Sequence, residues 1–228
     1  MNTTDFDKLK LALRGRLIGL SMIDPEYHWA IKAFNFAESV HDGVRKDGVT
    51  REFYHMISIL GMAMDHHANF INPCQVYIDI LLHDTVEDYP QYQDEVRQLF
   101  GLRANGAFLL SKKVHYPLIE GGFRSENKPT ALYFKALAGD PSASVSKGFD
   151  REHNLSTMIG VFKLKKQLAY AAEVKEHFLP MLKEAKRRFP EQDAIYENIK
   201  SMLNTEARFV EHYCNALLKA GCSPDDVV

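Results

Sequence analysis

Apolar residues recur along this chain with the spacing of α-helices. Between Phe6 and Met22, for instance, five leucines recur near helical spacing. Runs in which apolar β-branched residues alternate with polar ones, as in strands, are nearly absent. Because a period of about 3.6 residues indicates helices and a period of 2 indicates strands, the pattern predicts an all-α protein.

Prolines and glycines divide this helical pattern into segments. Asp24-Pro25 and Asn72-Pro73 each place proline behind a residue that caps helices, and proline suits the first helical turn. We expect a polar loop over 43–50 and a long loop over 114–129. Helices are expected at about 6–22, 25–41, 53–66, 73–86, 90–100, 102–113, 130–138, 143–161, 163–188 and 193–220. The last two could pack as an antiparallel hairpin.

The helix expected over 73–86 differs from the others because it is apolar nearly all round. It carries Val76, Ile78, Ile80, Leu81 and Leu82. A helix without a polar face is expected at the centre of a fold. No linker forces a second domain. We therefore predict that residues 1–228 form a single domain, with its core at about 25–175 and a helical extension at about 176–222.

The overall charge limits the classes of partner. The 28 lysines and arginines and the 30 acidic residues leave a net charge of −2. No general basic field is therefore available to hold a nucleic-acid backbone, which argues against general DNA or RNA binding. A local basic pocket for a small polyphosphate stays open.

The cysteines and the first residues of the sequence indicate the cellular compartment in which the protein is expected. Cys74, Cys214 and Cys222 are odd in number and lack CxxC spacing, which disfavours a disulfide framework and a thiolate metal site. No apolar run approaches the roughly 20 residues that span a bilayer. The first residues are acidic and polar, unlike a signal peptide. We expect a cytoplasmic protein with reduced cysteines and no membrane segment.

The candidate chemistry begins at the end of the most apolar helix, with the segment HDTVED at positions 83–88. Three acids and a histidine are costly there unless they are paired or bound to a metal. His83 and Glu87 are four residues apart, as are Asp84 and Asp88, so each pair shares one helix face. Successive turns could then supply metal ligands and acid–base groups. A solvated helix end is the alternative, because the dipeptide His-Asp is common.

Two further residues could complete a metal site. His55 begins the preceding helix, and Asp150 lies in a helical stretch beside Arg151. Taken singly, each has an ordinary alternative, as a structural histidine or as a carboxylate in an ion pair. Together with His83 and Asp84 they form a set of two nitrogen and two carboxylate ligands without a thiolate. Such a set suits Mn²⁺, Fe²⁺ or Zn²⁺ and argues against a structural zinc site.

Sequence segments between about His28 and Tyr170 follow one another in the order of a known family. They are AESVHDGVRKDG at 37–48, Tyr54-His55, LLHDTVED at 81–88, Phe100-Gly101 and KGFDREHN at 147–154. With these segments the chain resembles the hydrolase domain of the RelA/SpoT-type alarmone enzymes, and especially the stand-alone small alarmone hydrolases. LLHDTVED is highly specific to this family among HD proteins, and the ordered set is stronger than any one segment.

The resemblance implies a fold and a set of site residues. The fold would be an all-α HD-domain helical bundle. The metal ligands would be His55, His83, Asp84 and Asp150, and the family usually uses Mn²⁺. Glu87 and Asp88 would position and deprotonate the attacking water. The nucleotide site would be lined by Arg45, Lys46, Lys147, Asn154 and Tyr170.

The resemblance also implies a reaction. The family removes pyrophosphate from the 3′ position of (p)ppGpp and leaves GDP or GTP. The chain has no room for the synthetase domain of the long bifunctional enzymes, so we expect a hydrolase only. Its partner would be a small nucleotide, and the last helices could serve a homodimer interface.

The chain departs from the family pattern near two expected ligands, His55 and Asp150. The run REFYHM at 51–56 lacks the prolines usual before and after the histidine, and Gly148 and Phe149 replace the usual apolar pair. Two alternatives stay open. One is the same chemistry on a ppApp-type alarmone, on the 2′-phosphate of NADPH or on an RNA 3′-end pyrophosphate. The other is a non-catalytic HD regulatory module.

Overall fold

The computed structural model describes residues 3–227, and its helices confirm the all-α class. The helices are α1 (Thr3–Ile23), α2 (Tyr27–Val40), α3 (Phe53–Asp65), α4 (Pro73–Asp88), α5 (Gln93–Phe100), α6 (Asn105–Leu110), α7 (Thr130–Leu137), α8 (Pro141–Thr157), α9 (Leu164–Glu173), α10 (Leu179–Arg188) and α11 (Asp193–Lys219). Within the described residues they are accompanied by a two-stranded sheet of β1 (Lys113–Pro117) and β2 (Phe123–Asn127). Short 3₁₀ segments lie at His67–Asn69, Pro90–Tyr92, Gly101–Ala104 and Pro190–Gln192.

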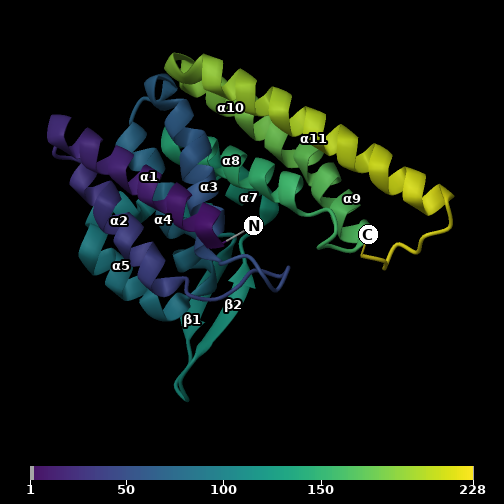
Figure 1. Ribbon diagram of the computed structural model, residues 1–228, viewed down its shortest axis with the longest axis horizontal. Coiled ribbons are helices and arrows are strands. Elements are labelled where there is room, and N and C mark those ends of the chain that lie inside the picture. Colours follow the sequence, from purple (N-terminus) through teal and green to yellow (C-terminus); the bar gives the residue numbers. More distant parts are fainter. Residues whose placement is uncertain (1–2, 228) are drawn as a thin grey trace.

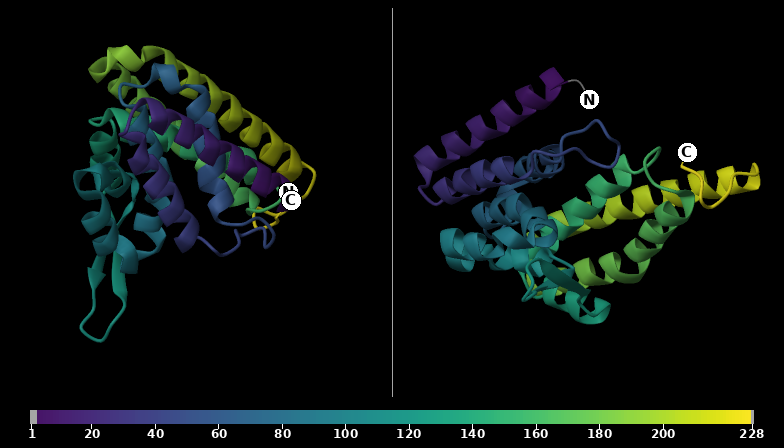
Figure 2. Two further views of the ribbon diagram at one scale, coloured as in Figure 1. Left: turned by 60° about the vertical axis from the view of Figure 1, so that its left-hand side comes forward. Right: turned by 90° about the horizontal axis from the view of Figure 1, so that it is seen from below.

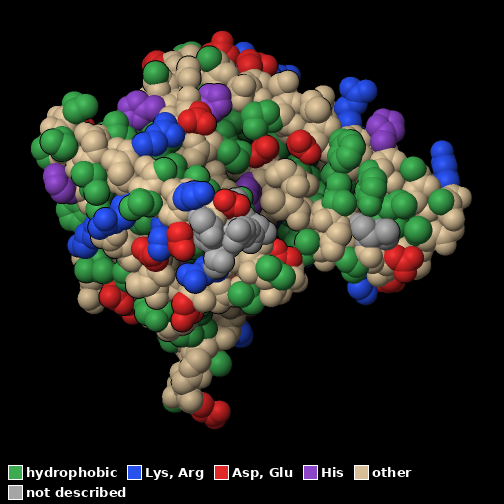
Figure 3. Space-filling view, viewed as in Figure 1, with side chains coloured by type: hydrophobic (Ala, Val, Ile, Leu, Met, Phe, Trp, Pro, Cys, Tyr) green, Lys and Arg blue, Asp and Glu red, His purple; other side chains and the backbone are tan. Residues whose placement is uncertain are grey.

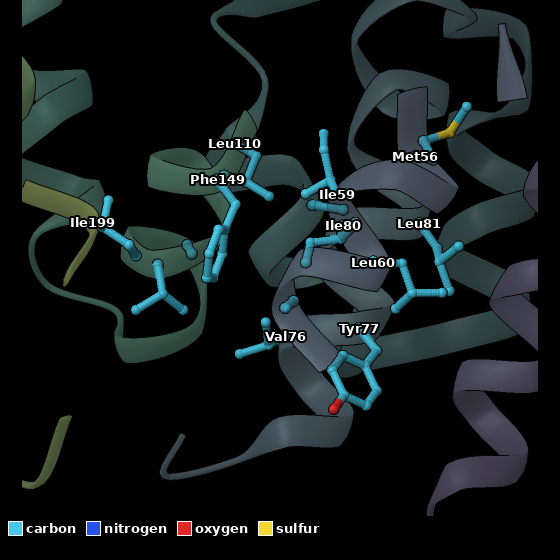
Figure 4. Close-up of a cluster of buried hydrophobic side chains, with 14 of the residues drawn as sticks. Met56, Ile59, Leu60, Val76, Tyr77, Ile80, Leu81, Leu110, Phe149 and Ile199 are labelled. Carbon is cyan, nitrogen blue, oxygen red and sulfur yellow. The ribbon is translucent and has the colours of Figure 1, made fainter. Parts of the chain in front are cut away.

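Helix α4 lies at the centre of the fold, as its apolar sequence predicted. It packs against α2, α3, α6 and α8. Val76 and Ile80 of this helix belong to the buried cluster shown in Figure 4. Asn72 accepts a hydrogen bond from the Gln75 N–H at 3.0 Å and so caps the helix ahead of Pro73. The cap fixes the residue at which α4 begins, and the buried residues fix how the helix packs. Together they place the last turns of α4, which carry His83 and Asp84.

The remaining helices surround α4. Figures 1 and 2 show α1 and α2 along one side of the body and α11 along another. The helices α10 and α11 contact each other and run in opposite directions, as predicted, and α11 also packs on α8 and α9. A Cβ at Gly148 of α8 would lie 2.6 Å from Cγ2 of Ile199 on α11. The glycine that departs from the family pattern therefore allows this close packing.

The segment expected as a loop over 114–129 contains a β-hairpin, so that prediction was wrong. Lys113 pairs with Asn127 at one end of the antiparallel register. Gly121 and Gly122 supply the turn with φ of 88° and 84°, a region that favours glycine. Both strands are short and largely exposed, and neither presents a buried apolar face. Polar and apolar residues alternate only over Lys113–Tyr116 of β1, a run too short to stand out in the sequence. The hairpin projects from the helical body (Figures 1 and 3).

Several expected helix ends are shifted for local reasons. The second helix begins at Tyr27, because Asp24 caps a turn that precedes it. The helix expected from 143 begins two residues earlier, where Asp140 accepts hydrogen bonds from two backbone N–H groups. The helix expected over 102–113 is split into a 3₁₀ segment and α6, and it ends at Leu110 because the chain then enters β1.

Charge is spread over the visible surface but gathers inside one cavity. On the face shown in Figure 3, basic and acidic side chains are interspersed. None of the helices among residues 3–227 combines the length and the apolar composition that crossing a bilayer requires. The basic residues that line the cavity are Arg45, Lys46, Lys112, Lys113, Lys147 and Arg151.

Candidate metal and phosphate site

Three helices bring the four expected metal ligands together. His55 stands in the first turn of α3, His83 and Asp84 lie near the end of α4, and Asp150 lies in α8. His55 Nε2 is 3.1 Å from Asp150 Oδ1 and 3.7 Å from Asp84 Oδ2. One ligand atom each from His55, His83 and Asp150 lie within 4.8 Å of one another. This group could hold a metal ion.

The two ring nitrogens of His83 have different surroundings. Its Nδ1 donates to the Ile80 carbonyl at 2.7 Å. Its Nε2 is buried and lies 3.0 Å from Asp84 Oδ1, yet makes no directed hydrogen bond. Burial alone would lower the pKa of His83, but the carboxylates of Asp84 and Asp150 raise it well above its usual value. A buried nitrogen that faces two carboxylates is a place where a divalent cation can replace a proton.

Asp150 is held by residues one turn away on the same helix. Lys147 Nζ donates to its Oδ2 at 2.7 Å, and Asn154 Nδ2 donates to its Oδ1 at 2.7 Å. Spacings of three and four residues place these side chains on one face of α8. Burial opposes ionisation of Asp150, but Lys147, His55 and His83 hold its pKa well below the usual range. The Asp150 carboxylate therefore stays ionised. Its Oδ2 faces Lys147, and its Oδ1 faces Asn154 and His55.

His153 supports the site, although sequence reasoning did not single it out. Its Nδ1 lies 2.8 Å from His55 Nδ1, and both rings are buried. Burial, followed by the charges of His55 and Arg45, lowers the pKa of His153 to about 3. The neutral ring can accept a hydrogen bond from His55 Nδ1–H, so the lone pair of His55 Nε2 could bind a metal ion in place of the proton that Nε2 shares with Asp150. In the sequence, the feature that could have pointed to His153 as a site residue was its position three residues after Asp150, on the same face of a helix.

Glu87 and Asp88 lie one turn beyond the ligands of α4 and meet the base of the hairpin. The Lys112 N–H donates to Glu87 Oε2 at 2.9 Å, and Lys113 Nζ pairs with Asp88 Oδ1 at 2.7 Å. His115 Nε2 also lies 3.0 Å from the Glu87 carbonyl oxygen. Both acidic residues line the cavity. The base of the hairpin therefore orients both carboxylates, a contact that the sequence did not reveal.

The cavity beside these residues has a volume of about 700 Å³. This size falls in the range of sites that bind small molecules. All the expected substrate contacts line it, namely Arg45, Lys46, Lys147, Asn154 and Tyr170. The structure thus brings the expected metal ligands, acids and substrate contacts to one place.

Arg45 and Lys46 enter the cavity from the loop between α2 and α3. Asp47 shapes this loop by accepting the Thr50 N–H at 2.8 Å. Arg45 Nη1 is buried without a hydrogen-bond partner. Lys46 Nζ lies 5.4 Å from the ring centroid of Phe162. The loop therefore presents two cations to an anionic ligand, one of them beside an aromatic ring.

A further group of cavity residues comes from α8, α9 and the segment before the hairpin. Arg151 lies over two rings, with its Cζ 4.2 Å from the centroid of Tyr170 and 4.5 Å from that of Phe178. Glu173 forms ion pairs with both Arg151 and Lys112. Of these residues, sequence reasoning named only Tyr170 as a site residue.

A π-helical turn at Val174–Phe178 positions part of this group. The sequence predicted one uninterrupted helix over 163–188, but the π turn separates α9 from α10. Because a π turn pairs residues five apart, Glu173 and Phe178 come to lie on the same side. Both contact Arg151. Such turns occur frequently at functional sites.

A polar network supports α4 from the side of α2 and α3. His41 Nε2 lies 2.9 Å from Thr85 Oγ1, and Tyr89 Oη donates to Glu52 at 2.5 Å. Burial lowers the pKa of His41, although Asp84 and Glu52 oppose this. His41, Glu52 and Tyr89 line the cavity as well. The departure of Glu52 from the family pattern thus introduces an extra carboxylate beside the site.

Part of this chain is similar in sequence to known proteins. No family model matches this chain. The chain is similar to the guanosine-3′,5′-bis(diphosphate) 3′-pyrophosphohydrolase of Spiroplasma citri, with 30% identity over 143 residues, which are 62% of this chain and 18% of that protein. It is also similar to the GTP pyrophosphokinase rsh of Brucella ovis and of Brucella abortus, with 28% identity over 152 residues, which are 66% of this chain and 19% of each relative.

The chain spans about a fifth of the length of the curated relatives it matches. The similarity covers about two thirds of this chain. These relatives confirm that the chain resembles the RelA/SpoT-type enzymes, as its ordered motifs predicted.

Proposed function

We propose that this chain is a metal-dependent hydrolase that removes pyrophosphate from the 3′ position of (p)ppGpp. The observation that carries the proposal is the buried His83 Nε2, which has no hydrogen-bond partner and faces carboxylates beside a cavity lined with basic residues. A cation and an anionic nucleotide are the ligands that match such surroundings. The relative from Spiroplasma citri carries the name of this activity.

The donor set supports a divalent cation. His55 and His83 offer imidazole nitrogens, and these lie close to carboxylate oxygens of Asp84 and Asp150. This mixture suits Mn²⁺, Fe²⁺ or Zn²⁺, and we favour Mn²⁺ because it is usual in the family that the motifs resemble. When bound, the ion would supply Lewis acidity to an adjacent phosphoryl group.

Glu87 and Asp88 are proposed to orient and deprotonate the attacking water. Lys112 and Lys113 hold the two carboxylates in place before a substrate binds. A general base must lie within hydrogen-bond reach of the proton that it removes, and both carboxylates line the cavity. Attack at the phosphorus next to the sugar breaks its bond to the 3′ oxygen. The products are pyrophosphate and a nucleotide with a free 3′-hydroxyl.

The remaining cavity residues are proposed to bind the nucleotide. Arg45 and Lys46 would contact its phosphates from the loop before α3, and Asn154 would contact it from α8. Tyr170 offers a ring for the base, because aromatic side chains stack on flat ring systems. Lys147 lies against Asp150, where it can contact a phosphate beside the metal ligands.

A nucleotide panel tests the proposal. Protein loaded with Mn²⁺ is incubated with ppGpp, ppApp, NADPH and an RNA that carries a 3′ pyrophosphate, and products are separated by ion-exchange chromatography. We expect ppGpp to yield GDP and pyrophosphate, and the Asp84→Ala variant to yield neither. Turnover of another nucleotide alone would assign the same chemistry to that substrate. No turnover at micromolar enzyme would refute the hydrolase and favour a non-catalytic module.

A further inference from the structure

The β-hairpin leaves one strand edge open to solvent. Because its sheet has two strands, each strand is paired along one side and unpaired along the other. All five residues of β2 are exposed, and the hairpin extends beyond the helical body in Figures 1 and 2. An open edge of this kind is a template for pairing with a further strand.

The ladder of the hairpin determines which backbone groups of β2 are free. The Lys128 N–H donates to the Lys112 carbonyl at 2.8 Å, one pair beyond the end of the register. Hydrogen-bonded pairs alternate with non-hydrogen-bonded pairs in an antiparallel ladder, so the backbones of Arg124 and Glu126 also bond to β1. The backbone N–H and C=O groups that point away from β1 are therefore those of Phe123, Ser125 and Asn127.

The outer edge of β1 is less suited to pairing. Pro117 lies on this edge and has no N–H to donate. Lys113 and His115 of the same edge contact the end of α4. The sequence of β2, FRSEN, contains neither proline nor lysine, two residues that commonly block strand edges. A further strand would therefore pair with β2.

The charges of β2 are complementary to those of a second copy of the same strand. Arg124 and Glu126 flank Ser125 and share one face of the strand. If two copies pair antiparallel about Ser125, Arg124 of each lies opposite the partner's Glu126. These charged pairs fall at non-hydrogen-bonded positions, where the Cα atoms are only about 4.5 Å apart and side chains interact most closely.

The same charges disfavour other registers. A shift by two residues in one direction would place Arg124 opposite the partner's Arg124, and the opposite shift would do the same for Glu126. Like charges directly opposite each other destabilise a sheet. Within one chain Arg124 pairs with Glu126 at 2.7 Å, but the two side chains are 66% and 51% exposed. Such an exposed pair is weak, so it can be exchanged for the pair between chains at little cost.

Exposed apolar residues at the tip of the hairpin fit the same arrangement. Leu118 and Ile119 at the tip are exposed, and so is Leu132 in the first turn of α7. Antiparallel pairing about Ser125 directs the tip of each hairpin towards the base of the other, where the partner's α7 begins. Burial of these side chains between the two copies would add apolar contact to the backbone hydrogen bonds.

We propose that β2 is the interface of a homodimer in which two hairpins pair about Ser125 into one four-stranded sheet. The contact belongs to the hairpin, in place of the last helices that the sequence suggested. A five-residue edge buries less than the roughly 1,200 Å² of a stable interface, so we expect a dissociation constant on the order of 100 μM. The inference is independent of the proposed function, because pairing leaves the contacts at the base of the hairpin with Glu87 and Asp88 in place.

Sedimentation velocity of the full chain, from about 10 μM to about 1 mM, measures the dimer. Arg124→Glu and Glu126→Arg each place like charges opposite each other and should weaken the dimer about 10-fold or more. The double variant is again self-complementary and should dimerise as the wild type does. Arg208→Glu, a charge reversal at an exposed position of α11, is the matched control and should have no effect. Loss of the dimer in this control would assign the interface to α11 and overturn the proposal.

A mixture of the two single variants separates the effect between chains from the effect within a chain. Each single variant has lost its internal pair between positions 124 and 126. Together, however, the two variants are complementary across the interface. The mixture should therefore dimerise with about the affinity of the wild type. A mixture that dimerises no better than either variant alone would refute the charge pairing.

Disulfide cross-linking tests the register directly. Cys74 and Cys214 are buried, so the substitutions are made in a Cys222→Ser background. Ser125→Cys should cross-link two copies on oxidation, because position 125 opposes itself at a Cα separation of about 5.5 Å. Asn127→Cys is the matched control on the same face of β2, but it lies opposite the partner's Phe123 and should not cross-link. Circular dichroism confirms that the variants fold. Equal cross-linking at both positions, or a wild type that stays monomeric throughout the concentration range, would overturn the proposal.

Discussion

His153 Nδ1 lies 2.8 Å from His55 Nδ1, so one buried histidine orients another whose opposite nitrogen faces Asp150. Only one of the two Nδ1 atoms needs to carry the shared proton. Because burial keeps His153 neutral, with a pKa of about 3, that ring can act as the acceptor. Partners of this kind select the tautomer of a histidine that binds a metal.

This contact predicts a graded loss of metal binding. His153→Phe removes the acceptor and should weaken Mn²⁺ binding about 10- to 100-fold. His153→Asn keeps an oxygen acceptor and should retain more of the affinity. Titration of Mn²⁺ into metal-free protein measures both constants, and circular dichroism confirms folding. Equal losses in two folded variants would contradict the orienting role.

The roles proposed for Asp84 and Glu87 predict different phenotypes. Asp84→Ala should lose metal and activity together, because it removes a ligand oxygen. Glu87→Gln should keep its metal, because an amide oxygen can still accept the Lys112 N–H, but should lose turnover by about 10²- to 10⁴-fold. Metal analysis and kcat with ppGpp test both statements. Equal metal loss in the two variants would contradict the assignment.

Gly106 faces the buried carboxylate of Asp79 at very short range. A Cβ at Gly106 would lie 2.2 Å from both carboxylate oxygens of Asp79. Gly106→Ala should therefore lower the free energy of unfolding by about 2–3 kcal/mol, measured by urea denaturation. Gly15→Ala is the control, because a Cβ there meets nothing within 4 Å. On an exposed helix this change should be neutral or slightly stabilising.

A double variant checks the cause of that destabilisation. Removing the carboxylate with Asp79→Ala makes room for the new methyl group at Gly106. The cost of Gly106→Ala should then be much smaller in the Asp79→Ala background than in the wild type. Additive effects of the two substitutions would show that the clash is not the cause.

Asp79 also predicts a pH dependence of stability. Full burial raises its pKa well above the usual value, and the hydrogen bond from Gln75 offsets only part of this. Between the unfolded and the folded pKa, the folded state holds a proton that the unfolded chain releases. The stabilisation is thus complete at low pH and declines as the pH rises.

Asp79→Asn isolates this effect, because the amide cannot ionise. The unfolding free energy of the variant relative to the wild type should increase as the pH rises above the ordinary pKa of an aspartate, about 4. Urea denaturation at several pH values measures the difference. A difference that is independent of pH would show that Asp79 does not titrate in this way.

Much of the fold could be predicted because helical period, caps and proline positions are local properties of the sequence. The centrality of α4 followed from its uniformly apolar surface, and Asn72 marked its start. The expected metal ligands could be named because their segments occur in the order of a known family. The structure brings His55, His83, Asp84 and Asp150 together, although their roles as ligands stay predictions.

The hairpin could not be predicted, because it depends on contacts between segments and not on a local property of the sequence. The strand β2 is exposed on both faces, and β1 is half-buried only at Lys113 and His115, so no buried apolar face reveals the strands, and they depend on pairing with each other. The contacts of Lys112 and Lys113 with the two acids join residues 25 positions apart. The π turn likewise depends on tertiary packing, because Glu173 and Phe178 both contact Arg151 of α8.

By itself, therefore, the sequence determined the all-α class, the central helix, and the residue types from which a metal and phosphate site can be built. Only the tertiary structure decided that His153 orients His55, that the base of the hairpin holds Glu87 and Asp88, and that Lys112, Lys147 and Arg151 line one cavity. The physical reason is that these relationships depend on distances between side chains of different segments. Local periodicity carries no information about such distances.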